Sequence, residues 1–90
     1  MAEITVTRSA AERFRVEVRE GTSRTVHEVK ATAADVRRYG ASAAPEELLQ
    51  ASFEFLLERE PKESILRSFD LPVIERYFPE YPQRIRELLP

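Results

Sequence analysis

Two carboxylates that share one helical face are the first residues to consider for chemistry. Glu54 and Glu58 are four residues apart, so their side chains lie on the same side of the helix predicted there. Two adjacent carboxylates can raise a pKa or bind a divalent cation. With Glu47 and Gln50 they form an acidic stripe. This stripe is either a solvated helix face or a surface for a basic partner. The mild repulsion between carboxylates four residues apart slightly favours the basic partner.

Other residue types used in catalysis and metal binding are scarce. The chain has one histidine, His27, in a predicted strand, and it has no cysteine. A cysteine nucleophile is excluded, and a zinc site of ordinary ligands nearly so. His27 is expected to be a half-exposed strand residue. Two glycines are too few to build a phosphate-binding loop. From these scarcities together we predict no cofactor, no metal and no enzyme activity.

Basic residues follow the predicted hairpin of the N-terminal part. A basic two-stranded ribbon can enter the major groove of DNA, which makes nucleic-acid binding one alternative. Glutamates are interleaved with these cations, however, and ion pairs across the strands explain the pattern without nucleic acid. The net charge of −2 also gives no dense positive field. The candidate nucleic-acid contacts are Arg13, Arg15, Arg19, Arg24 and Lys30.

An aromatic corner lies near the C-terminus. The segment YFPEYP, residues 77–82, combines three aromatic residues with two prolines. If the corner is exposed, Tyr77 and Tyr81 offer an attractive contact surface. In the other interpretation they fix a terminal helix onto the core.

The elements that position these residues begin with a β-meander. Apolar and polar residues alternate over residues 4–7 and 13–19, and less regularly over 24–31, which predicts three antiparallel strands within residues 2–31 with one face on the core. A two-residue turn at Gly21 predicts a register between the second and third strands. In this register Phe14 faces Val29, Val16 faces His27, Val18 faces Thr25 and Arg15 faces Glu28.

Proline residues divide the rest of the chain into helices. A short helix is expected over 32–40, and the longest helix over about 45–60. Apolar residues cover about two-thirds of that long helix, so it should contact the sheet on one side. Its other side should contact the C-terminal helices or a second subunit. Shorter helices are expected over 62–69, over 71–78 with Asp70 as N-cap, and over 83–89.

The predicted fold is therefore α+β: a three-stranded antiparallel meander followed by four to five helices, with the longest packed on the sheet. Ninety residues make a single domain over residues 1–90, with a meander over 1–31, a short helix over 32–40 and a helical part over 45–90. No apolar run approaches the ~20 residues of a membrane span, and the N-terminus does not have the pattern of a signal peptide. A cytoplasmic protein is expected.

One stretch carries a resemblance. The run from Phe53 to Pro82, preceded by PEELL at residues 45–49, resembles a group of small bacterial proteins with no assigned function. The run RTVHEVKATAADVRRYG, from Arg24 to Gly40, is similar to the same group. The resemblance implies a stand-alone bacterial cytoplasmic protein, and it carries no activity or binding residues to transfer.

These patterns lead to one favoured function and two alternatives. The favoured function is a non-enzymatic protein-interaction module, with a homodimer as one form of it. Its candidate partner contacts are Glu47, Gln50, Glu54, Glu58, Tyr77 and Tyr81. The first alternative is a nucleic-acid-associated regulator that uses the basic hairpin. The second is a carboxylate-dependent enzyme or divalent-cation binder at Glu54 and Glu58.

Overall fold

Three antiparallel strands form the N-terminal part of the chain. Apolar and polar residues alternate in the first two, which favours strands with one buried face. The computed structural model describes residues 2–89, in which these strands are β1 (Glu3–Ala10), β2 (Arg13–Glu20) and β3 (Ser23–Lys30). Gly21 takes a φ of 60° in the turn between β2 and β3, where glycine pays no steric cost. The three predicted strands are therefore confirmed.

The predicted register between β2 and β3 is confirmed as well. The buried residues of both strands point to the same side of the sheet, and the residues between them point to the other. The pairs that face each other include Phe14 with Val29, Val16 with His27, Val18 with Thr25 and Arg15 with Glu28.

The sheet has a fourth strand that the sequence analysis does not predict. This strand, β4 (Ser68–Asp70), pairs parallel with β3 and lies at the sheet edge opposite β1. The helix predicted over 62–69 is wrong, since only a short 3₁₀ turn, η1 (Lys62–Ser64), forms there. The sheet is therefore mixed, with strand order β1-β2-β3-β4.

Backbone hydrogen bonds explain why residues 65–70 are extended. A helix this short gains little stability by itself. The outer edge of β3, in contrast, offers unpaired backbone groups. The Glu28 N–H donates to the Arg67 carbonyl at 2.7 Å, and the Leu71 N–H donates to the Lys30 carbonyl at 2.9 Å. Pairing with a strand about forty residues earlier thus overrides the local helical pattern.

The short helix α1 (Ala33–Gly40) forms close to its predicted bounds. The Thr32 hydroxyl accepts from the Asp35 N–H at 3.1 Å, and the Asp35 carboxylate accepts from the Thr32 N–H at 3.0 Å. This reciprocal pair is a capping box. The positive φ after the helix, 52°, belongs to Ala41. Gly40 instead allows a close approach, because a Cβ there would lie 3.3 Å from a methyl group of Leu48.

The longest helix, α2 (Pro45–Leu57), lies across the sheet and contacts β1, as predicted. Helices α1 and α4 (Tyr81–Leu88) pack on its other sides. Leu57 is the only large apolar residue of α2 that is not buried. Of the two neighbours predicted for its other side, the C-terminal helices and a second subunit, the structure shows the first, through α4. Helix α2 leaves no broad apolar face uncovered. The buried residues of α2 are Leu48, Leu49, Ala51, Ser52, Phe53, Phe55 and Leu56.

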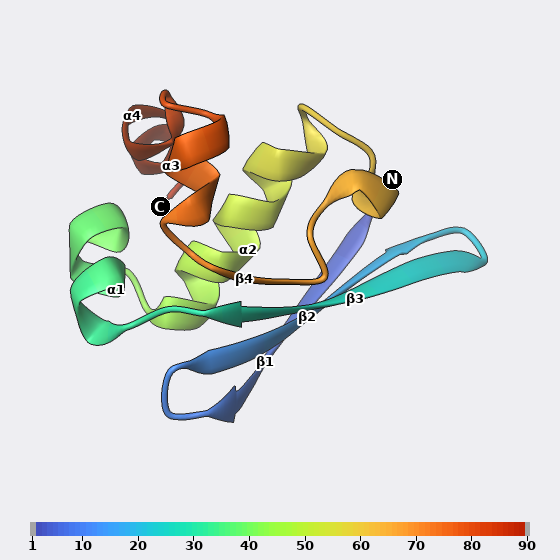
Figure 1. Ribbon diagram of the computed structural model, residues 1–90, viewed down its shortest axis with the longest axis horizontal. Helices are drawn as coiled ribbons and strands as arrows, with labels where there is room; N and C mark the ends of the chain where they lie inside the picture. Colours follow the sequence, from blue (N-terminus) through green and yellow to red (C-terminus); the bar gives the residue numbers. More distant parts are fainter. Residues whose placement is uncertain (1, 90) are drawn as a thin grey trace.

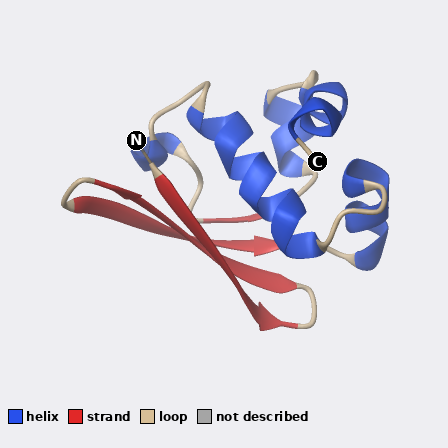
Figure 2. Ribbon diagram, turned by 180° about the vertical axis from the view of Figure 1, so that it is seen from behind, coloured by secondary structure: helices blue, strands red, loops and turns tan. Residues whose placement is uncertain are grey.

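The C-terminal helices are shorter than predicted or begin earlier. Helix α3 (Val73–Tyr77) spans only five residues, and the expected N-cap, Asp70, is instead the last residue of β4. Helix α4 begins at Tyr81, two residues before its predicted start. The described helices all lie on one side of the sheet, which leaves its other face uncovered (Figures 1 and 2).

Candidate functional site

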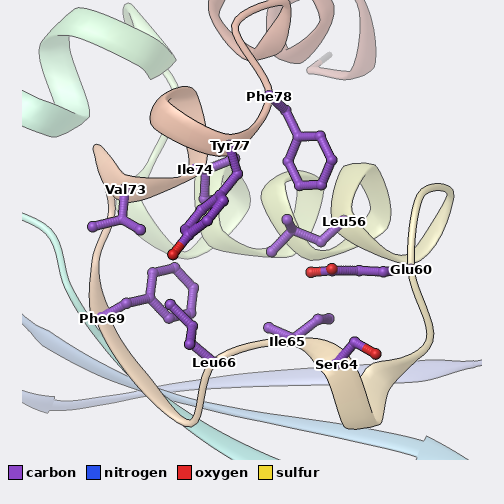
Figure 3. A pocket seen from close by; sticks show the side chains of 10 residues that line it. All are labelled: Leu56, Glu60, Ser64, Ile65, Leu66, Phe69, Val73, Ile74, Tyr77 and Phe78. Carbon is purple, nitrogen blue, oxygen red and sulfur yellow. The ribbon is translucent and has the colours of Figure 1, made fainter.

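A small apolar cleft opens between the C-terminal end of α2, the segment that leads into β4, and α3 (Figure 3). Eight of its ten lining residues are aliphatic or aromatic, and the two polar ones are Glu60 and Ser64. The cleft volume is about 210 Å³, whereas small-molecule sites usually exceed about 300 Å³. The cleft therefore suits one or two side chains of a bound chain better than a cofactor.

Two exposed hydrophobic side chains mark the rim of this cleft. Leu66 is 47% exposed and Tyr77 is 67% exposed, and these are the only large hydrophobic residues among residues 2–89 in that class. Both line the cleft. Single exposed hydrophobic residues are normal on a protein surface, but neighbouring ones at a concave site are typical of contact surfaces.

The local fold explains why Leu66 is exposed. In the predicted helix, Ile65 and Leu66 would both belong to the buried stripe. In the extended chain, successive side chains point in opposite directions, so Ile65 is buried and Leu66 is exposed. Phe69 is partly buried, with its ring centroid 6.2 Å from that of Phe53. The strand-like path thus forms the floor and one rim of the cleft.

Glu60 contributes a carboxylate to the otherwise apolar cleft. Its side chain points into the space between Leu56 and Ile65 (Figure 3). Burial raises the pKa of the Glu60 carboxyl above its ordinary value, since the charged form loses hydration. Within residues 2–89, no cation lies within ion-pair distance of Glu60, although Arg59 beside it makes three ion-pair or hydrogen-bond contacts of its own. The cleft therefore holds a carboxylate without a cationic partner.

His27 fixes the rim of the cleft from the core side. It is fully buried rather than half-exposed as predicted. Its Nδ1 lies 2.8 Å from the Leu66 carbonyl oxygen, and its Nε2 lies 2.8 Å from the Thr25 hydroxyl. Because the Leu66 carbonyl can only accept, Nδ1 carries the proton and Nε2 accepts from Thr25. Burial lowers the pKa of His27, which keeps the imidazole neutral.

Arg59 holds the wall at the end of α2. Its guanidinium carbon lies 3.7 Å from the centroid of the Phe55 ring and 5.9 Å from that of Phe78. The same group donates to the Glu80 carboxylate at 3.1 Å, which ties α2 to the start of α4. Phe55 and Phe78 meet edge to face with centroids 5.9 Å apart. These contacts place Phe78 as a firm wall of the cleft.

The predicted acidic stripe lies on the exposed side of α2 and outside the cleft. Glu47 caps its own helix, since its carboxylate accepts from the Ala44 N–H at 2.9 Å. Glu58 pairs with Arg59 at 3.3 Å and with Arg84 at 3.9 Å. Glu54 is exposed and Gln50 is half-buried. The structure thus gives Glu47 and Glu58 local roles, and the stripe as a partner surface stays a prediction.

The two predicted tyrosine contacts separate. Tyr77 lies exposed at the cleft. Tyr81 is fully buried, and its hydroxyl lies 2.7 Å from the Ser52 hydroxyl. The expectation that Tyr81 contacts a partner is therefore wrong, because α4 begins at this residue and turns its ring between Tyr39 and Phe55. Burial raises the pKa of Tyr81, so its phenol stays protonated.

The five predicted nucleic-acid contacts share the uncovered face of the sheet. Arg13 lies opposite Lys30, and Arg19 lies opposite Arg24. Four carboxylates lie on the same face, and one of them, Glu17, accepts from Arg24 at 2.6 Å. The Arg24 guanidinium lowers the pKa of Glu17. The face is therefore nearly balanced in charge, and these four carboxylates are Glu3, Glu17, Glu28 and Asp70.

No cluster in the described part of the chain resembles a metal site. Among residues 2–89, no three histidine or carboxylate side chains come together in a way that could hold a metal ion. Glu54 and Glu58 do not line the cleft.

In the same part of the chain, residues 2–89, no helix has the length and apolarity needed to span a membrane.

Most of the cleft is not predicted from the sequence. Tyr77 is among the predicted contacts, but Leu66 and Glu60 are not, because Leu66 falls in the buried stripe of the predicted helix and Glu60 belongs to no predicted site. One signal was available: Pro61 and Pro72 leave little room for a stable helix between them. Comparisons of the chain with protein-family models, with curated proteins and with solved structures find no match.

Proposed function

We propose that this chain is a non-enzymatic protein-interaction module whose cleft receives an apolar side chain of a partner protein. The observation that carries the proposal is the position of Leu66 and Tyr77. Both large hydrophobic residues that are exposed among those described lie at the rim of one cleft. Binding energy at protein interfaces concentrates where a large apolar side chain fills a preformed pocket.

The chemistry of the cleft specifies the partner further. An incoming apolar side chain covers Leu66 and Tyr77 and removes more water from Glu60. An ionised carboxylate in such surroundings is stabilised by a cation on the bound chain. The proposed occupant is therefore a protein segment that carries one large apolar residue with a Lys or Arg beside it.

The volume of the cleft and the fixed position of its walls support the same occupant. About 210 Å³ leaves room for a side chain but not for a nucleotide or a flavin. The His27 imidazole and the Arg59 guanidinium hold opposite walls in place before any partner arrives. A preformed pocket loses less conformational entropy on binding, which increases affinity.

A selection with a displayed peptide library tests the proposal. The full chain is immobilised, and random peptides of about twelve residues are selected against it. Enriched peptides should share a large apolar residue and a nearby Lys or Arg. A Leu66→Ser, Tyr77→Ser double variant should lose at least about tenfold in affinity for them, the range of a lost apolar anchor. Val26→Ser, an apolar-to-serine change on the uncovered sheet face, is the matched control and should bind normally.

The outcome can also contradict the proposal. Peptides that bind the double variant as well as the original chain would show that they use another surface. Failure to enrich any common sequence would also overturn it. In a third arm, Glu60→Gln should keep the preference for the apolar residue and lose the preference for Lys or Arg.

A second candidate function is binding of nucleic acid by the uncovered sheet face. The like-charged pairs Arg13–Lys30 and Arg19–Arg24 favour it, because like charges directly opposite each other are destabilising unless an anion neutralises them. A mobility-shift titration with duplex DNA and with single-stranded RNA in low salt tests this function. An Arg13→Gln, Lys30→Gln double variant should weaken a shift that Arg37→Gln, on the helical side, leaves intact. No shift at micromolar protein would exclude it.

A further inference from the structure

The strand at the other edge of the sheet has an open outer side. β1 spans eight residues and pairs with β2 on one side only. Within residues 2–89, no backbone hydrogen bond links β1 to any other segment, and no side chain donates to or accepts from its backbone. About half of the N–H and C=O groups of such a strand point away from the sheet. An edge of this length is a template for pairing with another strand.

Features that usually protect an edge strand are absent from the central part of β1. The segment EITVT, residues 3–7, contains no proline and no lysine, and its pairing with β2 is regular. The one irregularity lies between Arg8 and Ala10, near the end of the strand. The opposite edge strand, β4, is protected by its length of only three residues. β1 is therefore the edge that is prepared for pairing.

We infer that β1 pairs antiparallel with β1 of a second copy of this chain, with Thr5 on the two-fold axis. In this register Thr5 faces the partner's Thr5, Ile4 faces the partner's Val6, and Glu3 faces the partner's Thr7. The sequence around Thr5 is self-complementary, since β-branched residues face β-branched residues on both sides of the sheet. Such pairing gives a closed two-fold dimer.

The side chains of β1 favour this register over its neighbour. Ile4 and Val6 are only half-buried on the helical side, and each covers the other's exposed part across the axis. A register centred on Val6 would instead place the Arg8 charge opposite Ile4 on the apolar side. The register centred on Thr5 leaves Arg8 at the rim, where it already pairs with Glu46 at 3.8 Å.

Charge complementarity identifies the occupant as a second copy rather than an unrelated strand. β1 begins with the acidic Glu3 and ends near the basic Arg8. Antiparallel pairing of two copies therefore brings opposite charges to the same end of the interface, with Glu3 on the uncovered face and the partner's Arg8 on the helical side. On the uncovered face, Glu3 also approaches the partner's Arg15, which lies next to the partner's Thr7. Within residues 2–89, Arg15 has no carboxylate within 4.0 Å in the single chain.

The oligomeric state of the full chain tests the inference. Light scattering over a concentration series should show the mass rising from that of one chain, 10.4 kDa, to twice that value. Thr5→Lys places two cations against each other on the axis and should raise the dissociation constant at least about tenfold. The monomer should tolerate this change, because Thr5 is exposed and lies opposite Glu17. Thr22→Lys adds the same charge in the β2–β3 turn and should leave the dimer intact.

A cross-linking experiment tests the register separately. The chain has no cysteine, so single variants report one position each. Thr5→Cys should form a disulfide-linked dimer at least about tenfold faster than Thr7→Cys, because only position 5 faces itself. Faster linking of Thr7→Cys would overturn the register. A monomer mass at every concentration, or equal dimerisation of Thr5→Lys and Thr22→Lys, would overturn pairing through β1.

Discussion

The imidazole of His27 donates from Nδ1 to the Leu66 carbonyl oxygen over 2.8 Å, across 39 positions of sequence. The bond joins a fully buried residue of β3 to the exposed rim of the cleft. It also completes the polar contacts of the imidazole, since Nε2 accepts from the Thr25 hydroxyl. The position of the cleft rim therefore depends on the only histidine of the chain.

The first prediction concerns this bond. His27→Phe keeps an aromatic ring against Phe53 but leaves the Thr25 hydroxyl without its partner. We expect the free energy of unfolding to fall by about 1–3 kcal/mol, the cost of an unsatisfied buried polar group. Adding Thr25→Val should recover part of the loss. Urea unfolding of the single and double variants measures the coupling, and strictly additive losses would contradict it.

Stability should also depend on pH through His27. Burial lowers the pKa of the folded form, so below the ordinary value of about 6.5 the unfolded chain binds more protons. The contribution of His27 to the free energy of unfolding is then fully present above that pH. It is lost as the pH falls from that value toward the folded-state pKa. The slope is at most about 1.4 kcal/mol per pH unit for one group.

Urea unfolding at pH 7.5, 6.5 and 5.5 measures this slope. His27→Phe should flatten the curve in this range. Glu60 acts in the opposite direction, because burial raises its pKa and its protonation then favours the folded state. Glu60→Gln should therefore steepen the loss of stability toward low pH. An unchanged slope in His27→Phe would show that other groups cause the dependence.

A third prediction concerns the buried Tyr81 hydroxyl. The Ser52 hydroxyl donates to the Leu48 carbonyl at 2.7 Å, so Tyr81 donates to Ser52. Tyr81→Phe removes this hydrogen bond and should lower the free energy of unfolding by about 1 kcal/mol. Tyr77→Phe is the matched control on the exposed ring and should change it by less than about 0.5 kcal/mol. Equal effects of the two variants would contradict the assigned bond.

The fourth prediction compares two neighbouring residues after α1. Ala41 has a φ of 52°, and a sparsely populated backbone conformation of this kind costs a residue with a Cβ about 1–3 kcal/mol. Ala41→Gly should raise the melting temperature, by several degrees for about 1 kcal/mol in a domain of this size. Gly40→Ala should give a smaller gain than Ala41→Gly, because the new Cβ would lie 3.3 Å from a Leu48 methyl group, which has to shift by a few tenths of an ångström. Thermal unfolding of both variants checks this order.

The sequence predicts the meander well because its signals are local. The alternation of apolar and polar residues along the strands and the turn at Gly21 together determine which residues of β2 and β3 face each other. The capping pair of Thr32 and Asp35 likewise predicts where α1 begins. Each of these signals acts within a few residues, so no knowledge of the distant chain is needed.

The segment from Pro61 to Leu71 shows where such reasoning fails. Its apolar residues suit a helix, and the choice of an extended path depends on the open edge of β3 and on His27. Both lie about forty residues earlier, where the local pattern cannot reveal them. The cleft follows from this path, so most of its lining could not be predicted. Tyr77 is predictable from the sequence, because the aromatic corner that contains it is a local feature and depends on no distant strand.

The strand order β1-β2-β3-β4 has a consequence for avidity. It places the cleft beside β4 at one edge of the sheet and the self-complementary strand at the other. Two copies joined through β1 would carry their clefts at the two far ends of one continuous sheet. A partner with two copies of the recognised segment could then engage both clefts at once, and weak single contacts would combine into tight bivalent binding.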